Sequence, residues 1–215
     1  MAVIHRTTLT PTKLELLGAW LPSRPWYHGG AGEPQLAKAG GFRLDDPEGA
    51  VGIEFMVVTD TAGAEPTAYL VPLTYRGAPL DGAEENLIGT AEHGVLGRRW
   101  VYDGCHDPVL VAELAALLAG KAEPQAQSLT DTPDREVTRA YAGEGPVPTE
   151  FGAVTDTEEH TELSATGGTT LRVLRTPRPA PAEPGAVGHV AGGWEGPGGT
   201  RAHGVFFVLH ATPGA

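Results

Sequence analysis

Two alternating apolar runs separated by a turn-rich segment limit the possible folds of this sequence more than any other feature. The runs cover residues 51–57 and 69–75, and in each of them every second side chain is apolar or aromatic. Side chains on a β-strand point to opposite faces in turn, so each run predicts a strand with one buried face. Residues 59–66 (TDTAGAEP) supply turn formers, and the whole segment therefore predicts an antiparallel hairpin. Pro72 lacks an amide N–H, which predicts a sheet edge or a bulge at that position.

Glycine and proline are unusually frequent, with 30 and 19 among 215 residues, which indicates many turns. Further candidate strands lie at 42–44, 95–102, 137–142, 161–165, 169–175 and 203–211, and residues 2–8 form a short β-prone run. Because helices do not alternate with these strands, we expect antiparallel sheets and the α+β class. We expect loops at 23–38 and 76–91, and no regular structure at 178–199, where Pro and Gly dominate.

Two amphipathic segments predict helices. The first begins at Thr10-Pro11, carries an apolar stripe that includes Trp20, and ends at Pro22. The second has Asp107 as its N-cap and Pro108 at its first helical position, where a missing N–H costs nothing. Its apolar stripe runs over residues 110–118, and Gly120 supplies the C-cap.

These elements predict two parts joined by a composition shift. Residues 1–121 read as a helix-and-sheet domain, and residues 137–215 as a smaller antiparallel β subdomain. Residues 122–136 (AEPQAQSLTDTPDRE) lack apolar periodicity, so we expect a linker or a long exposed loop there.

The formal charge of −12 argues against several partners, because 27 acidic residues oppose 15 basic ones. A nucleic-acid site needs clustered Lys and Arg, and no basic cluster appears, so we expect neither nucleic acid nor an anionic membrane as a partner. Cys105 is the single cysteine, which excludes an internal disulfide. The first residues lack an apolar segment of the signal-peptide type, and we expect a cytoplasmic protein.

Several segments resemble the N-terminal cap domain of maltokinases over about residues 10–121. The segments that carry this resemblance are Trp20-Leu21-Pro22, Trp26-Tyr27, 69–76 (YLVPLTYR), 87–97 (LIGTAEHGVLG), 99–104 (RWVYDG) and Asp107-Pro108. The resemblance implies a curved antiparallel sheet packed on helices, described as cystatin-like. In that family an intermediate β subdomain and a kinase-like catalytic lobe follow the cap, and residues 137–215 would correspond to the intermediate subdomain. The resemblance also implies a place in maltose, trehalose or α-glucan metabolism.

The second half contains a shorter segment that resembles the kinase. Gly167 to Arg175 resembles the family's nucleotide-facing strand pair, with Arg172 at the position of the lysine that contacts the ATP phosphates. Phosphoryl transfer also needs a base and a metal-binding acid, which related enzymes draw from an H-G-D loop and a later Asp. This chain has no H-G-D, none of its three lysines falls on a predicted strand, and we expect no catalytic lobe to follow. We therefore expect a non-catalytic protein without a cofactor.

Three functions remain open at this point. The first is a regulatory or interaction module that binds a protein or a glucan. The second is an accessory subunit, or a diverged nucleotide-binding remnant, of a sugar kinase. The third is a small-ligand-binding fold, which would show a deep apolar pocket against the sheet.

Two sets of residues are candidates for a binding surface. A polar cluster is expected from Glu92, His93, Arg99, Trp100 and Asp103 in the strongest family segment, either as a buried network that fixes the shape or as the lining of a groove. Aromatic side chains that fall in predicted loops are candidates for exposed stacking, and these are Trp26, Tyr27 and Trp194. Trp20 lies on the apolar helix stripe and is expected in the core.

Cys105-His106-Asp107 contains residue types that bind zinc or act as nucleophiles. No C-x-x-C or H-E-x-x-H spacing accompanies it, and adjacent residues on a turn rarely chelate one ion together. Asp107 is already accounted for as a helix cap. We therefore expect no metal site and no catalytic cysteine here.

Overall fold

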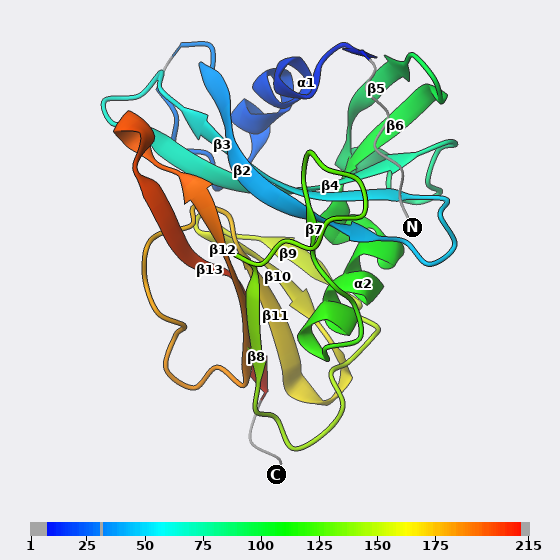
Figure 1. Ribbon diagram of the computed structural model, residues 1–215, viewed down its shortest axis with the longest axis vertical. Coiled ribbons are helices and arrows are strands. Elements are labelled where there is room, and N and C mark those ends of the chain that lie inside the picture. Colours follow the sequence, from blue (N-terminus) through cyan, green and yellow to red (C-terminus); the bar gives the residue numbers. More distant parts are fainter. Residues whose placement is uncertain (1–7, 31, 212–215) are drawn as a thin grey trace.

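The computed structural model describes residues 8–30 and 32–211, and the short run predicted at 2–8 lies almost entirely outside them. Within this part the strands form one antiparallel sheet in the order β1-β5-β6-β4-β3-β2-β12-β13-β11-β10-β9, while β7 pairs with β2 and β8 with β12 (Figure 1). The strands of the first half are β1 (Leu9–Thr10), β2 (Leu36–Asp45), β3 (Gly52–Asp60), β4 (Thr67–Arg76), β5 (Leu87–His93) and β6 (Gly97–Asp103). Those of the second half are β7 (Gln125–Ala126), β8 (Thr138–Tyr141), β9 (Val154–Asp156), β10 (His160–Ser164), β11 (Thr169–Leu174), β12 (Gly188–Glu195) and β13 (Arg201–Ala211).

Two α-helices pack on this sheet, α1 (Lys13–Trp20) and α2 (Pro108–Leu118). Short 3-10 turns lie at η1 (Leu21–Ser23), η2 (Glu84–Asn86), η3 (Gly104–His106), η4 (Thr166–Gly168) and η5 (Pro197–Gly199). A mostly antiparallel sheet with two helices confirms the α+β class. No helix of the described residues is long and apolar enough to cross a membrane.

The predicted hairpin is β3 and β4, which pair along their whole length from Gly52↔Tyr75 to Asp60↔Thr67. The expectation of one buried face is wrong, because both faces are covered. Ile53 and Phe55 pack in the core that α2 covers, whereas Met56 and Val58 pack in the core that α1 covers. Met56 and Val58, which fall between or after the alternating positions, are thus apolar because a second layer lies over them.

Pro72 lies inside the sheet rather than on an edge strand, but it still falls where β4 has no neighbouring strand that needs an N–H donor. β4 pairs with β6 only from Leu73 onward, so at Pro72 the strand has a neighbour on one side alone. Before this point the free side of β4 is used differently, because the N–H of Leu70 donates to the carbonyl O of Arg175 at 2.8 Å. Pro72, which has no N–H to donate, lies between Leu70, which bonds to Arg175, and Leu73, where the pairing with β6 begins.

The two helices begin and end with the residues that favour those positions. The second helix is confirmed: Asp107 caps α2 by accepting from the N–H of Val109, and Gly120 follows with a φ of 75°. The first begins later than expected, at Lys13, because Thr12 and Glu15 form a capping box there. It also passes Pro22 as the 3-10 turn η1, whose early positions tolerate proline.

The expectation of no regular structure at 178–199 is wrong for residues 188–195, which form β12. The glycines inside β12 serve close packing, since a Cβ added to Gly192 would stand 2.4 Å from the ring of Phe206, whereas Gly185 and Gly198 lie in turns at positive φ. Two other predicted loops also contain strand. Residues 23–38 include the start of β2, which places Lys38 on a strand, and residues 76–91 include the start of β5.

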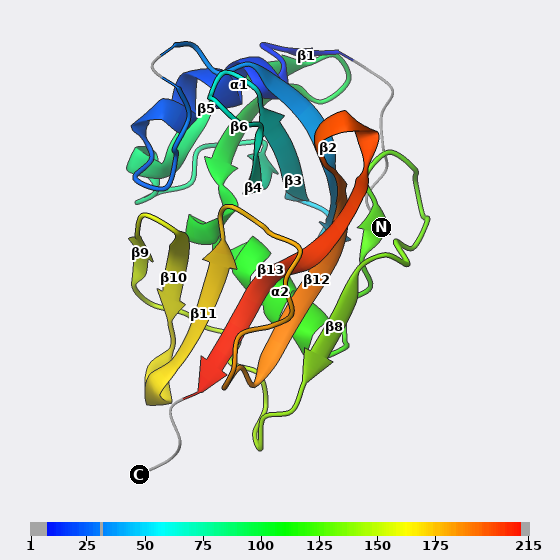
Figure 2. The same ribbon diagram turned by 90° about the vertical axis from the view of Figure 1, so that its left-hand side faces the viewer.

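The two halves of the chain share one hydrophobic core. β2 meets β12 through the pair Gly40↔Trp194, and Figure 2 shows β12 and β13 rising beside β2. The rings of Phe55 and Phe207 stand edge to face, 5.2 Å apart. The segment 122–136 crosses between the halves and contributes β7, which pairs with β2. Division into domains at this segment stays a prediction.

Candidate functional site

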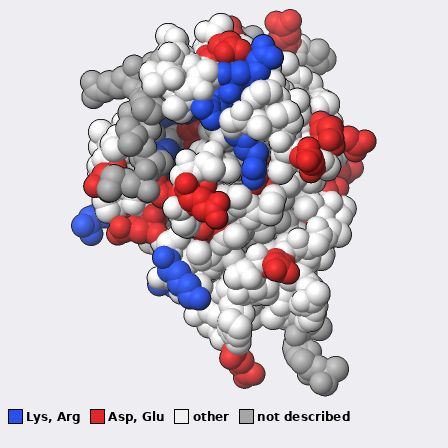
Figure 3. Space-filling view, turned by 90° about the vertical axis from the view of Figure 1, so that its right-hand side faces the viewer, with Lys and Arg blue, Asp and Glu red and all other residues white. Residues whose placement is uncertain are grey.

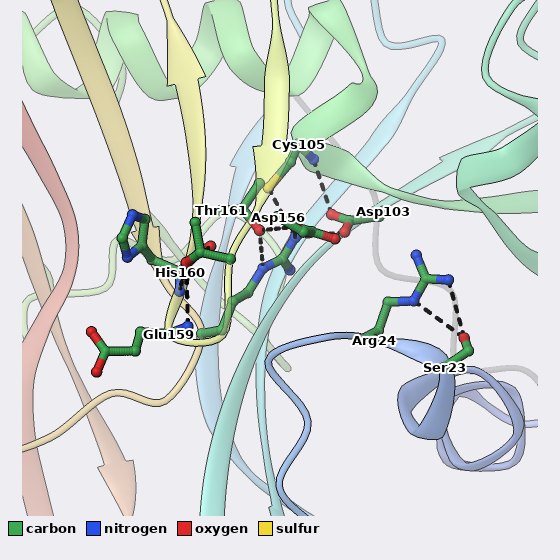
Figure 4. A network of polar contacts seen from close by, with 10 residues as sticks. Ser23, Arg24, Asp103, Cys105, Asp156, Glu159, His160 and Thr161 are labelled. Carbon is green, nitrogen blue, oxygen red and sulfur yellow. Dashed lines mark hydrogen bonds and ion pairs between the residues drawn. The ribbon is translucent and has the colours of Figure 1, made fainter.

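A buried arginine joins the two halves at the point where their strands meet. Arg175 follows β11 and has 0% exposed surface. Its Nε donates to Oγ1 of Thr161 at 2.7 Å, and its Nη2 donates to Oδ2 of Asp103 at 2.5 Å. Thr161 in turn donates to Asp156 at 2.5 Å (Figure 4). We call Arg175, Asp103, Asp156, Thr161 and Cys105 the junction network.

The other sides of this guanidinium face an aromatic ring and a thiol. The Arg175 Cζ lies 4.6 Å from the ring centre of Trp26, and its Nη2 lies 3.4 Å from Sγ of Cys105. Burial would lower the pKa of Arg175, but the charges of Asp103 and Asp156 outweigh it and raise that pKa. Burial raises the pKa of the Cys105 thiol well above its ordinary value, so it is a neutral packing group. The network therefore serves first to hold the halves together.

Sequence reasoning named only one member of the junction network among its candidate site residues. Asp103 was a candidate because it lies in the family-like segment, whereas Arg175, Thr161 and Asp156 were not. In the sequence, Arg175 stands at the end of a candidate strand, in the segment that resembles the nucleotide-facing strand pair. Asp103 and Arg175 are far apart in sequence, so no local spacing connects them.

The predicted polar cluster does not come together. Glu92 and His93 lie at the β5–β6 turn, whereas Asp103 lies at the opposite end of β6. Glu92 forms an exposed ion pair with Arg98, 3.0 Å long, with both side chains about three-fifths exposed. Of the five residues predicted to form this cluster, only Asp103 belongs to a buried network. Its charged partner, Arg175, comes from the second half of the chain.

The β5–β6 turn is instead a rigid hairpin tip that presents apolar side chains. His93 accepts through Nδ1 from the amides of Val95 at 3.3 Å and Leu96 at 3.0 Å, and Nη2 of Arg99 donates to the carbonyl O of Leu96 at 2.6 Å. Val95 is 61% exposed and Leu96 is 46% exposed. We call the residues from His93 to Arg99 the hairpin tip. Trp100 follows it on β6 and is half-buried.

The expected exposure is wrong for two of the three candidate stacking residues. Trp26 is fully buried against Trp20, with ring centres 5.7 Å apart, and Trp194 lies in β12 with 3% exposed. Trp20 is buried as expected. Tyr27 is half-buried, and its hydroxyl donates to Asp60 at 2.6 Å. The loop composition around these residues concealed the nonlocal packing that covers them.

Of the residues considered for metal or nucleotide chemistry, Cys105, Asp107 and Arg172 each have their own partners. Cys105 faces Arg175, while Asp107 accepts two bonds from Arg76, at 2.6 and 2.7 Å. Within the described residues no group of His, Cys, Asp and Glu side chains is arranged as a metal site. Arg172, at the position likened to the kinase lysine, pairs with Glu162 at 3.1 Å and with Glu183 at 3.5 Å.

A second buried charge was not anticipated. Glu54 on β3 is 3% exposed and accepts from Lys13 at 2.6 Å, from the Tyr75 hydroxyl at 2.6 Å and from Gln127 at 2.7 Å. Burial raises the pKa of Glu54, but the Lys13 ammonium and these hydrogen bonds outweigh burial and lower that pKa. A lone glutamate inside an apolar strand was the available signal.

Comparison with known families supports the resemblance seen in the motifs. Residues 20–107 match the family model described as the maltokinase N-terminal cap domain, which covers less than half of the chain. The match lies within the region that the motifs indicated, so the resemblance is confirmed for this segment. No curated protein matches the chain.

Proposed function

We propose that this chain is a non-catalytic, cytoplasmic interaction module built on a maltokinase-type cap, and that the hairpin tip is its partner-binding element. The observation that carries the proposal is the rigid, exposed pair Val95 and Leu96 within the segment that matches the cap family. The partner would be a protein of maltose, trehalose or α-glucan metabolism. We also infer that the cap sheet is cystatin-like and that residues 137–215 correspond to the intermediate subdomain.

Turn positions normally carry Gly, Asn, Asp, Pro or Ser, which makes two large apolar residues at a tip unusual. Here the turn conformation is supported by Gly97, with a φ of 69°, and by the two bonds to His93. Val95 and Leu96 are thus free to face outward while their backbone is fixed. A preorganised contact loses little conformational entropy on binding, which favours affinity.

Charge around the tip suggests the chemistry of the partner surface. The segment from His93 to Arg99 contains Arg98 and Arg99 and no acidic residue, although the chain as a whole carries −12; Arg98 pairs with Glu92 just before it, so Arg99 supplies the remaining positive charge. Figure 3, which views the side of the molecule that carries β5 and β6 in Figure 1, shows several basic side chains in its upper part, with acidic side chains beside them and further basic ones at the left and lower left. We infer a partner with an apolar socket rimmed by carboxylates.

Three buried acidic groups of the cap segment are already paired, which supports a non-catalytic role. Asp107 is bound to Arg76, Asp103 to Arg175, and Glu54 to Lys13. A catalytic base or metal ligand needs a carboxylate that can reach substrate or ion. Arg172 is likewise engaged by two glutamates, which disfavours a phosphate contact.

The test uses the wild-type chain, the double variant Val95→Ser/Leu96→Ser, and Leu129→Ser as the matched control. Leu129 is 55% exposed but lies far from the tip in sequence, in the 122–136 segment. Each immobilised protein is exposed to native cell extract and the bound proteins are identified. We expect a sugar- or glucan-metabolising enzyme on the wild type and on Leu129→Ser, and its loss on the tip variant. Equal recovery by all three proteins would contradict the proposal.

The nucleotide-remnant alternative has its own measurement. If ATP with Mg²⁺ bound the folded chain, its free energy of unfolding would rise by about 2.7 kcal/mol at one hundred times the dissociation constant. We expect no change in melting temperature with millimolar ATP and Mg²⁺. A saturable rise that Arg172→Met abolishes would replace the interaction module with the nucleotide-binding alternative.

A further inference from the structure

A pocket of about 470 Å³ lies where the two halves of the chain meet, and Cys105 is one of its lining residues. One wall comes from η2, η3 and the start of α2, and the other from residues 149–154 and β10. Its size falls within the range of roughly 300–1,000 Å³ that is typical of small-molecule sites. The hairpin tip contributes no residue to it.

The pocket has an apolar floor and polar groups without partners. The floor includes Val111 and Leu163, which are buried, and the half-buried ring of Phe151 stands beside them. The lining residues also include Asn86 and His106, and neither side chain has a hydrogen-bond partner among the described residues. Polar side chains that line a pocket and lack partners are available to a ligand.

These polar groups are both donors and acceptors. Burial lowers the pKa of His106, so near neutral pH its ring is uncharged, with one nitrogen donating and the other accepting. The Asn86 amide also offers both, and the Glu150 carboxylate accepts. A hydroxyl group donates and accepts at once and can satisfy this mixed set, whereas an ammonium only donates. The C–H face of a ring or carbon chain suits the apolar floor.

The charge of the surroundings disfavours anions. Glu150 lines the pocket and is exposed, and the Asp107 carboxylate is neutralised by Arg76. The charges that act on His106 are those of two carboxylates, Asp103 and Asp156, and of two guanidiniums, Arg175 and Arg24, so Glu150 tips the balance toward negative charge. A phosphate or carboxylate ligand would meet net negative charge, while an uncharged ligand would not.

We propose that this pocket binds a small uncharged polyhydroxylated molecule, with Asn86, His106 and Glu150 contacting its hydroxyls and Val111, Leu163 and Phe151 contacting its carbon face. The site is separate from the hairpin tip, so it extends the proposed function without depending on it. Because the pocket lies between the two halves, an occupant contacts both of them at once.

The experiment titrates glucose, and separately glucose 6-phosphate, into the full chain and follows the resonances of pocket residues by NMR. Thr149→Trp places a large ring at the exposed rim, and Thr155→Trp is the control, because Thr155 is also exposed but does not line the pocket. Asn86→Ala removes one hydrogen-bonding group and should weaken glucose binding roughly fivefold. We expect saturable glucose binding to the wild type and to Thr155→Trp, its loss in Thr149→Trp, and weaker binding of glucose 6-phosphate.

Three results would overturn the proposal: no saturable binding of glucose to the wild type, unchanged binding by Thr149→Trp, or glucose 6-phosphate binding as tightly as glucose. The folded state of each variant is checked by its amide spectrum. Partner capture by the hairpin tip does not involve this pocket, so the two proposals fail independently.

Discussion

Arg175 and Asp103 are 72 residues apart in sequence, yet their side chains form a hydrogen-bonded ion pair 2.5 Å long in the interior of the protein. Asp103 ends β6 of the first half, and Arg175 follows β11 of the second. Their side chains are 2% and 0% exposed, so neither charge is solvated by bulk water. The pair therefore couples the folding of the two halves.

Replacing Arg175 by methionine should be strongly destabilising. The Asp103 carboxylate would remain buried without its cation, and breaking a buried pair in this way costs about 3–5 kcal/mol. The measurement is the free energy of unfolding from urea titration. Arg172→Met is the matched control, because its ion pairs are one-third exposed or more and should contribute at most about 1 kcal/mol. Equal losses in the two variants would refute the assignment.

Glu54 predicts how stability depends on acid. Its pKa in the folded protein lies below the ordinary value of 4.5, because Lys13 and the hydrogen bonds outweigh burial. The unfolded chain therefore binds the proton more readily, and stability falls as pH drops below about 4.5 and through the folded pKa. Glu54→Gln should remove this part of the pH dependence. The test measures the unfolding free energy of the wild type and of Glu54→Gln from pH 3 to 7, the range in which carboxylates titrate. Parallel curves for the two proteins would contradict this prediction.

His93→Ala should loosen the hairpin tip without unfolding the protein. The amides of Val95 and Leu96 would lose their acceptor, and a hydrogen bond contributes about 0.5–1.5 kcal/mol, which corresponds to roughly two- to tenfold faster hydrogen exchange. Exchange measured by NMR at these two amides checks the effect. His93→Asn keeps an acceptor oxygen at the position and should restore part of the protection. Unchanged exchange in His93→Ala would show that the ring does not hold the turn.

Gly192→Ala should destabilise the protein by about 1–3 kcal/mol, because the new methyl group would meet the Phe206 ring in a packed interior. Gly145 is the control, since a Cβ there meets no atom within 4 Å. The double variant Gly192→Ala/Phe206→Leu should lose less unfolding free energy than the sum of the losses in the two single variants, because the smaller side chain relieves the clash. Thermal unfolding compares the wild type with these four variants, and strict additivity of the two losses would argue against this contact.

The sequence predicted the local parts of the fold well. Helix α2 followed from Asp107, Pro108 and Gly120, whose effects act within one or two turns. The β3–β4 hairpin followed from alternation over neighbouring residues. These signals act over a few residues, and nothing remote is needed to interpret them.

What the sequence concealed depends on contacts between remote segments. β12 resembled a loop because its glycines are required by Phe206 on the neighbouring strand. Trp26 and Trp194 looked exposed because the layers that cover them come from elsewhere in the chain. The same reason applies to the candidate site: Asp103 was visible within a motif, but its partner Arg175 was not. The pocket beside Cys105 is likewise formed by segments that only the folded chain brings together.

The hydrogen bond from the N–H of Leu70 to the carbonyl of Arg175 joins the backbone of the family-matched segment to the second half of the chain. The stretch that matches the family, residues 20–107, is tied by this and other contacts to residues outside the match. A fragment ending at residue 121 would leave Asp103 without its cation, Leu70 without its acceptor, and Phe55 without the ring of Phe207. Truncation at residue 121 should therefore expose buried polar and apolar groups of the first half together, so we expect the first half to need the second for its full stability.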